Sequence, residues 1–106
     1  MRNPDDGASL AALDNALVTR LDVLDSKSIA SAVAATVARF GTIDALLNNA
    51  GYGAYGALEG TPMETIRRQL DVNVLGLIEV TKAVLLHIRG RAWTPAATRL
   101  SKTWPR

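Results

Sequence analysis

Several residue types are scarce or missing, and each absence excludes a class of site. The chain of 106 residues has no cysteine, so it offers neither a disulfide framework nor a thiolate metal site. Its one histidine, His87, is too few for a histidine-rich metal cluster. We therefore predict no metal site.

Long hydrophobic runs are missing as well. No apolar stretch approaches the roughly 20 residues that span a bilayer. The opening residues, MRNPDDGASL, lack the apolar segment of a signal peptide. With 48% hydrophobic and 21% charged residues, the composition is that of one small globular domain. We expect a soluble cytoplasmic protein.

Acidic residues are absent from the end of the chain. Residues 1–87 carry seven lysines and arginines against ten acidic residues, whereas residues 88–106 carry five and none. The last segment also holds both tryptophans, Trp93 and Trp104, and has neither helical nor strand periodicity. We expect a folded domain over residues 1–88 and a basic, irregular, weakly packed tail over residues 89–106.

The body of the chain has the pattern of alternating strands and helices. β-forming residues predict a strand over Leu17–Asp22. A second short strand over Ile43–Leu47 is almost continuously apolar, as expected of a parallel strand covered on both faces. Each strand is followed by a helical pattern, so the order strand, helix, strand, helix predicts an α/β fold.

Two main helices are predicted from periodicity and capping signals. Asp25 is the N-cap of the first, over residues 26–39, whose apolar residues recur every four positions. The second runs from Pro62 to about Ile88, with Thr61 as N-cap and Glu64 completing a capping box. Gly76 is its expected weak point. Its apolar stripe comprises Ile66, Leu70, Val74, Leu77, Ile78, Leu85 and Ile88.

A glycine-rich stretch, NNAGYGAYG, separates the second strand from the long helix. Gly51, Gly53 and Gly56 have the spacing of a dinucleotide fingerprint. That fingerprint requires the glycines to lead directly into a helix, whose N-terminal N–H groups hold the phosphates. Here the helix signals begin only at Thr61. We therefore interpret the stretch as a connecting loop, the alternative being a pyrophosphate site.

Three short motifs follow one another along the chain: LDVLD, NNAG and DVNVLG. Together they resemble the short-chain dehydrogenase/reductase family, from about Arg2 to Arg89. The resemblance implies a partial Rossmann-like doubly wound unit that lacks the first two strands and the C-terminal half. In the sheet order 3-2-1-4-5 the strands present would be the third and fourth. They would either pair with each other or keep open edges.

The resemblance also implies a site for the adenosine half of NAD(P). Asp22 and Val23 match the position that contacts the adenine amino group, although a surface turn aspartate is the alternative. Asn48, Ala50 and Gly51 match the motif that borders the adenosine, and the alternative is an ordinary Asn/Gly turn.

Other matches concern the catalytic end of such a site. Asn73 matches the helix asparagine of the family's catalytic tetrad, which positions a water in the proton relay; the alternative is a solvated or locally bonded side chain. Tyr52 and Tyr55 would lie near the substrate mouth or be exposed loop aromatics. If Arg2 ends the second strand of the sheet, it favours NADP(H) over NAD(H).

Parts of the family pattern are absent from this sequence. The tyrosine four residues before a lysine is missing, because Lys27, Lys82 and Lys102 follow Val23, Ile78 and Thr98 at that spacing. The phosphate-binding glycine loop and the catalytic serine are missing too. We expect a truncated relative of enzymes that interconvert small-molecule alcohols and carbonyls with NAD(P), of the hydroxysteroid or retinol type, and inactive alone.

Two other functions fit parts of the sequence. A non-catalytic interaction protein would pack its long helix against another dehydrogenase subunit, or against a second copy in a homo-oligomer. A nucleic-acid binder would use the basic residues and tryptophans of the tail; those residues are Arg89, Arg91, Arg99, Lys102 and Arg106. A terminal basic run is more often a solvated tail.

Overall fold

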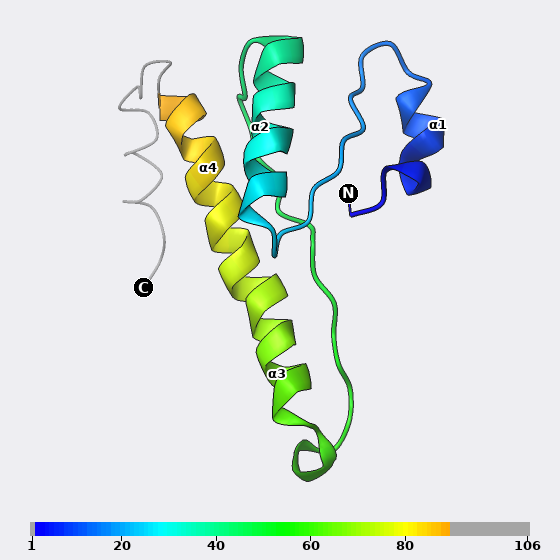
Figure 1. Ribbon diagram of the computed structural model, residues 1–106, viewed down its shortest axis with the longest axis vertical. Coiled ribbons are helices and arrows are strands. Elements are labelled where there is room, and N and C mark those ends of the chain that lie inside the picture. The colour runs from blue at the N-terminus through cyan, green and yellow to red at the C-terminus, as the bar shows by residue number, and fades with distance from the viewer. Residues whose placement is uncertain (1, 90–106) are drawn as a thin grey trace, which may run out of the picture.

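A computed structural model describes residues 2–89, and the predicted basic tail with both tryptophans lies outside them, apart from the backbone of Arg89. The described chain is helical with long extended connections (Figure 1). In chain order its elements are η1 (Pro4–Gly7), α1 (Ala8–Ala11), α2 (Ser26–Phe40), η2 (Leu58–Gly60), α3 (Met63–Leu70), η3 (Asp71–Gly76) and α4 (Leu77–Arg89).

Helix α2 agrees with the prediction at both ends. The carboxylate of Asp25 accepts hydrogen bonds from the backbone N–H groups of Lys27 and Ser28, at 3.0 and 3.2 Å, and so caps the N-terminus. Gly41 ends the helix in the left-handed conformation with φ of 77°, and its N–H donates to the carbonyl of Val37 at 2.7 Å.

The long helix is also confirmed, although its start and its middle differ from the prediction. It begins at Met63 with Pro62 in the N-cap position and no side-chain cap. The predicted capping box is wrong because the Thr61 hydroxyl donates instead to the carbonyl of Ala57, at 2.9 Å. Between α3 and α4 lies the π-helical turn η3, with wider backbone hydrogen bonding than an α-helix.

The core lies between α2 and α4, which run side by side in Figure 1. Ile29 and Val33 of α2 meet Val80 and Val84 of α4, and all four side chains are buried. The predicted stripe on the long helix is mostly on its outer side, since several members are exposed: Leu70, Val74, Leu77 and Ile78. The buried line is instead Gly76, Val80 and Val84, four residues apart.

Neither predicted strand forms among the residues that the structure describes. Residues 17–22 and 43–47 are extended, but they flank an apolar groove of about 370 Å³ and do not form a sheet ladder. Leu17, Val18 and Leu21 of the first segment line this groove, as do Ile43 and Leu46 of the second. An isolated extended segment is no strand, because a strand needs a hydrogen-bonded neighbour.

The expectation that the second segment is covered on both faces is wrong for the same reason. Ile43 packs against the helical core, whereas the side chain of Leu47 is 87% exposed. The sequence left open whether the two segments pair with each other or remain unpaired, and in the structure they do not form a ladder with each other.

None of the helices formed by residues 2–89 is long and apolar enough to cross a membrane.

Candidate nucleotide site

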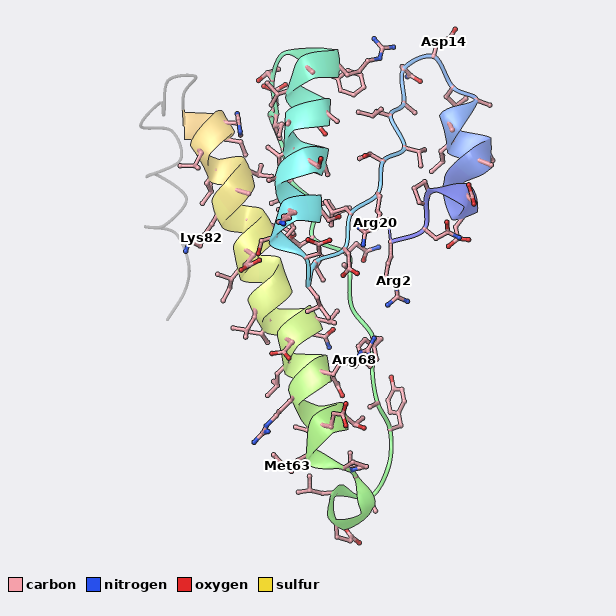
Figure 2. All side chains as sticks on the ribbon, in the orientation of Figure 1. Arg2, Asp14, Arg20, Met63, Arg68 and Lys82 are labelled. Atoms are coloured by element: carbon pink, nitrogen blue, oxygen red, sulfur yellow. The ribbon has the colours of Figure 1, made fainter. Side chains whose placement is uncertain are left out.

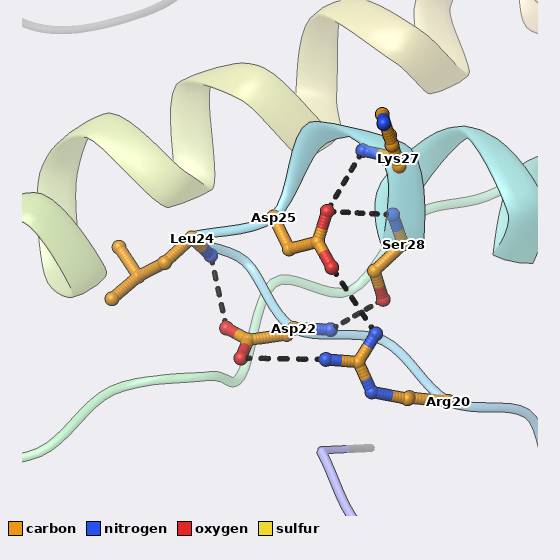
Figure 3. Close-up of polar contacts among 6 residues, drawn as sticks. All are labelled: Arg20, Asp22, Leu24, Asp25, Lys27 and Ser28. Carbon is orange, nitrogen blue, oxygen red and sulfur yellow. Dashed lines mark hydrogen bonds and ion pairs between the residues drawn. The ribbon is translucent and has the colours of Figure 1, made fainter.

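The turn before α2 fixes the position of Asp22. Its backbone N–H donates to the buried Ser28 hydroxyl at 2.9 Å (Figure 3). Its carbonyl accepts from the N–H of Asp25 at 3.0 Å. One carboxylate oxygen accepts from the Leu24 N–H at 3.1 Å, and the other lies 3.9 Å from the Arg20 guanidinium. The predicted alternative, a turn aspartate, is therefore part of its role.

These contacts leave acceptor capacity on Asp22. An ionised carboxylate has about four lone-pair positions, and the contacts with Leu24 and Arg20 occupy two of them. The carboxylate also lines a pocket. A structural turn role and recognition of an amino group by the same side chain are thus compatible.

Arg20 links this turn to the helix cap. Its guanidinium donates to the second oxygen of Asp25 at 3.2 Å. The N–H of Ser28 and then the Arg20 guanidinium hold the pKa of the Asp25 carboxyl below its ordinary value. One arginine therefore ties together the carboxylate at the pocket and the carboxylate that starts α2.

The second extended segment is tied to the long helix by side-chain amides. Asn48 donates from Nδ2 to the Thr81 hydroxyl on α4 at 2.9 Å. Asn73 contacts both polar groups of Tyr52, since its Oδ1 accepts from the Tyr52 N–H at 3.1 Å and its Nδ2 donates to the Tyr52 carbonyl at 2.8 Å. The half-buried Asn73 side chain is therefore bonded to the extended segment.

Gln69, which sequence reasoning missed, continues the same contact. Its Oε1 accepts from the N–H of Ala54 at 3.2 Å. Gln69 and Asn73 are four residues apart, so they lie on one helix face and bond to the extended chain two residues apart, as a neighbouring strand does. The spacing of the two amides in a helical pattern is the sequence signal that predicts this.

Two glycines allow the close approach of these segments. A Cβ atom on Gly51 would lie 3.0 Å from Oδ1 of Asn73. A Cβ atom on Gly76 would lie 2.8 Å from Cβ of Val23 and 3.0 Å from its carbonyl oxygen. Gly76, expected to weaken the helix, is therefore the point where the long helix contacts the backbone of a predicted site residue.

A pocket of about 590 Å³ lies where these segments meet, within the size range of small-ligand sites. Four of the predicted cofactor residues line it: Asp22, Val23, Ala50 and Gly51. Arg2 and Tyr52 line it as well, together with Arg68 and Val72, for which the sequence analysis had no role. Asn48 and Asn73 do not line the pocket; their hydrogen bonds join the extended segment that lines it to the long helix.

The glycine-rich segment does not have the geometry of a pyrophosphate site. Gly53 and Gly56 lie in an extended segment followed by the short η2, and α3 begins only at Met63. Tyr55 is 99% exposed and does not line the pocket. Among residues 2–89, no helix N-terminus follows the glycines directly, so the structure agrees with a connecting loop.

Comparisons with known proteins found a family model and relatives that match most of this chain. A family model described as enoyl-(acyl carrier protein) reductase matches residues 3–98. An uncharacterised oxidoreductase of Schizosaccharomyces pombe is 46% identical over 84 residues, which cover 79% of this chain and 36% of that protein. The 2-(R)-hydroxypropyl-CoM dehydrogenase of Xanthobacter autotrophicus is 41% identical over 81 residues, covering 74% of this chain and 32% of that enzyme.

Solved structures resemble the chain in the same way. A short-chain dehydrogenase from Streptomyces avermitilis superposes with a TM-score of 0.78 and 34% identity, over 86% of this chain and 34% of the other. A variant of ElxO with NADPH bound gives a TM-score of 0.73 and 25% identity, over 85% of this chain and 39% of the other. The chain thus spans about a third of the length of these relatives.

Proposed function

This chain belongs to the short-chain dehydrogenase/reductase family, and we propose that it supplies the adenosine-binding part of an NAD(P)-dependent oxidoreductase. The observation that carries the proposal is the single pocket lined by Asp22, Val23, Ala50 and Gly51. A carboxylate accepts hydrogen bonds from an amino group, and a glycine lets a ligand approach the backbone closely. NADPH bound to a related structure supports the same cofactor class.

We assign Asn73 to the position of the family's helix asparagine. Its location in the π-helical turn η3 supports this, since such turns are frequent at functional sites. One N–H and one lone pair of its amide are engaged with Tyr52, so the side chain holds the extended segment and keeps one N–H and one lone pair for a further partner. Asn73 is then a positioning residue in this chain.

The chain alone should not catalyse the family reaction. Hydride transfer needs a bound nicotinamide, which the cofactor supplies, and an acid or base for the carbonyl oxygen. No lysine of the sequence has a tyrosine four residues before it. Losing general acid–base help typically lowers a rate by about 10²- to 10⁴-fold. We therefore propose the oxidoreductase activity and the cytoplasmic location for a protein of the length of these relatives, and no catalysis by this chain alone.

The substrate class follows from the relatives. Full-length relatives carry names such as hydroxypropyl-CoM dehydrogenase, so we propose a small-molecule alcohol or carbonyl for the complete site. Arg2 lines the pocket, and a guanidinium there favours NADP(H) over NAD(H).

A second candidate function is a non-catalytic interaction protein. The exposed apolar side chains on the long helix favour it, because Leu70, Val74 and Ile78 recur every four residues and share a face. Another dehydrogenase subunit, or a second copy of the chain, would cover that face. Dinucleotide binding is not required by this function, which separates it from the first.

Affinity measurements on the purified chain test the first proposal. We expect 5′-AMP to bind as tightly as NAD⁺, because the second phosphate and the nicotinamide of NAD⁺ would make no contact with the proposed adenosine site. Asp22→Ala should weaken both ligands, whereas Gly56→Ala, outside the pocket, should leave both unchanged. Binding that requires the whole dinucleotide, survives Asp22→Ala and fails with Gly56→Ala would show that the glycine-rich segment is the phosphate site.

A further inference from the structure

Polar side chains on one side of the long helix hold the extended segment 48–54 at three points. The bonded pairs are Asn48 with Thr81, Tyr52 with Asn73 and Ala54 with Gln69. Residue numbers rise along the segment while those of its partners fall along the helix, so the two run antiparallel. Figure 2 shows them side by side. The segment is therefore positioned by a helix and needs no neighbouring strand.

The last of these contacts fixes the direction of the segment. In an extended chain, the N–H and C=O groups of one residue point to the same side as those of the residue two positions on. Asn73 bonds to both groups of Tyr52, and Oε1 of Gln69 accepts from the N–H of Ala54 at 3.2 Å. A segment held at one residue can swing about that point. A second contact two residues further on prevents this.

Gly53 makes the second contact necessary. It lies between the two bonded residues and has the wide φ/ψ freedom of a glycine. The side chain of Tyr52 is 41% exposed, so core packing does not fix its orientation. Only hydrogen bonds on both sides of Gly53 keep the chain straight at this place.

The segment held in this way forms one wall of the pocket, which consists of Ala50, Gly51 and Tyr52. Gln69 is half-buried and does not line the pocket itself. It can therefore influence a bound ligand only through the segment. When a wall has several arrangements, the observed affinity is reduced to the fraction of molecules in the arrangement that binds.

We propose that Gln69 is a positioning residue of this pocket. By accepting the N–H of Ala54, it keeps the wall at Gly51 and Tyr52 in the arrangement that binds adenosine. This inference rests on the proposed adenosine site, since it assigns Gln69 the task of holding one wall of that site.

Four variants separate this hydrogen bond from other effects. Gln69→Ala removes the acceptor, whereas Gln69→Glu keeps an oxygen that can accept from the Ala54 N–H. Arg67→Ala changes an exposed side chain of the same helix that does not line the pocket. Ile29→Val removes one buried methylene from the core between α2 and α4, and so lowers stability without touching the segment.

The experiment is a titration of the full chain and these variants with adenosine at pH 7, followed through amide NMR signals. We expect Gln69→Ala to weaken adenosine binding by about threefold to tenfold, as for the loss of one hydrogen bond. It should also shift the Ala54 amide signal before ligand is added. Gln69→Glu should restore most of the affinity. Arg67→Ala and Ile29→Val should bind as wild type does, with folding verified by circular dichroism.

The other outcomes distinguish this inference from the proposed function. Wild-type affinity in Gln69→Ala overturns the positioning role and leaves the adenosine site standing. An equal loss in Ile29→Val, or no recovery in Gln69→Glu, also overturns it, because the acceptor at residue 69 is then not the cause. If Gln69→Ala does not fold, Gln69→Met replaces it, since methionine keeps the side-chain length with only a weak acceptor. If the wild-type chain does not bind adenosine, the proposed function fails and this inference fails with it.

Discussion

At the scale of single residues, Asn73 shows why an amide is required where the long helix meets the extended segment. A peptide group offers one donor and one acceptor, and the asparagine amide offers the matching pair. Asn73 uses both on Tyr52, at 3.1 and 2.8 Å. Because the contact joins residues 21 apart in sequence, it is one of the few long-range polar contacts that hold the pocket wall on the helix.

The first prediction follows from this pairing. Asn73→Asp keeps an acceptor for the Tyr52 N–H but places a carboxylate oxygen against the Tyr52 carbonyl. We expect the free energy of unfolding to fall by about 0.5–1.5 kcal/mol, the usual net contribution of one hydrogen bond, because both bonds to Tyr52 lie at exposed positions. Urea unfolding measures this. Asn49→Asp is the control, because Asn49 is an exposed neighbour. Equal effects of the two substitutions would contradict a stabilising contact between Asn73 and Tyr52.

A second residue-scale prediction concerns pH and Asp25. Its pKa is lowered in the folded chain by the Ser28 N–H and the Arg20 guanidinium. A lowered folded pKa contributes stability that is present above the unfolded value and lost as pH falls through the folded one. The melting temperature should therefore drop as pH falls below about 4.

Two variants separate the charge of Asp25 from its cap. Asp25→Asn keeps an oxygen that can cap α2 but removes the charge paired with Arg20, so its melting temperature should be lower than wild type at pH 7 and approach it at pH 3. Asp25→Ala removes the cap as well, so its melting temperature should be lower than that of wild type at both pH 7 and pH 3. A constant difference between wild type and Asp25→Asn across this range would show that the charge has no role.

At the scale of elements, the contact between the long helix and the first extended segment depends on Gly76. An alanine there gains roughly 1 kcal/mol in helix propensity. Its Cβ would meet Val23 side chain and backbone at 2.8 to 3.0 Å, and such overpacking typically costs about 1–3 kcal/mol.

We therefore predict that Gly76→Ala destabilises the chain and also weakens adenosine binding, because Val23 lines the pocket. Urea unfolding and an adenosine titration measure the two effects. Gly60→Ala is the control, since a Cβ on Gly60 would meet nothing within 4 Å. A more stable Gly76→Ala variant with unchanged binding would mean that the close approach is not maintained in solution.

The extended segments are the elements most open to other chains. Leu47 is 87% exposed on an extended segment outside any sheet, and unpaired extended edges favour association. The long helix offers the competing surface, with Ile78 exposed on its apolar face. Either surface can bring two copies together.

Sedimentation velocity of two variants tells which surface is used. If the extended edge associates, Leu47→Lys should lower the fraction of oligomer and Ile78→Lys should not. The interaction function proposed for the long helix predicts the reverse. A wild-type chain that stays monomeric at high concentration would exclude association through both surfaces under those conditions.

Element by element, the sequence predicted what depends on local chemistry. Asp25 and Gly41 bound α2 because capping is decided by a few neighbouring residues. The strands at 17–22 and 43–47 were wrong, since a strand depends on a partner that local composition does not reveal. Thr61 failed as a cap because the carbonyl of Ala57 competed for its hydroxyl.

The candidate site divides in the same way. The motifs located Asp22, Val23, Ala50 and Gly51, which the fold brings to one pocket. They did not indicate Gln69, which bonds to the extended segment, or Arg68, which lines the pocket. The π-helical turn was not predictable from periodicity, because one wider turn changes the helix face without changing the apolar pattern.

At the scale of the whole molecule, the described chain has a small core and a large exposed apolar surface. The buried apolar side chains are few, namely Ile29, Ala32, Val33, Val80 and Val84. A chain that buries so little is expected to be only marginally stable. A ligand that bridges the turn before α2 and the extended segment at Gly51 should therefore stabilise it, in proportion to its concentration relative to the dissociation constant.

The central claim is that the family's adenosine site is present in this chain, and the most direct test is amide NMR of the labelled chain during titration with adenosine. The account predicts saturable shifts at Asp22, Val23 and Gly51, little change at Gly53 and Gly56, and loss of these shifts in Asp22→Ala. Shifts concentrated at Gly53 and Gly56, or shifts at the turn that persist in Asp22→Ala, would contradict it.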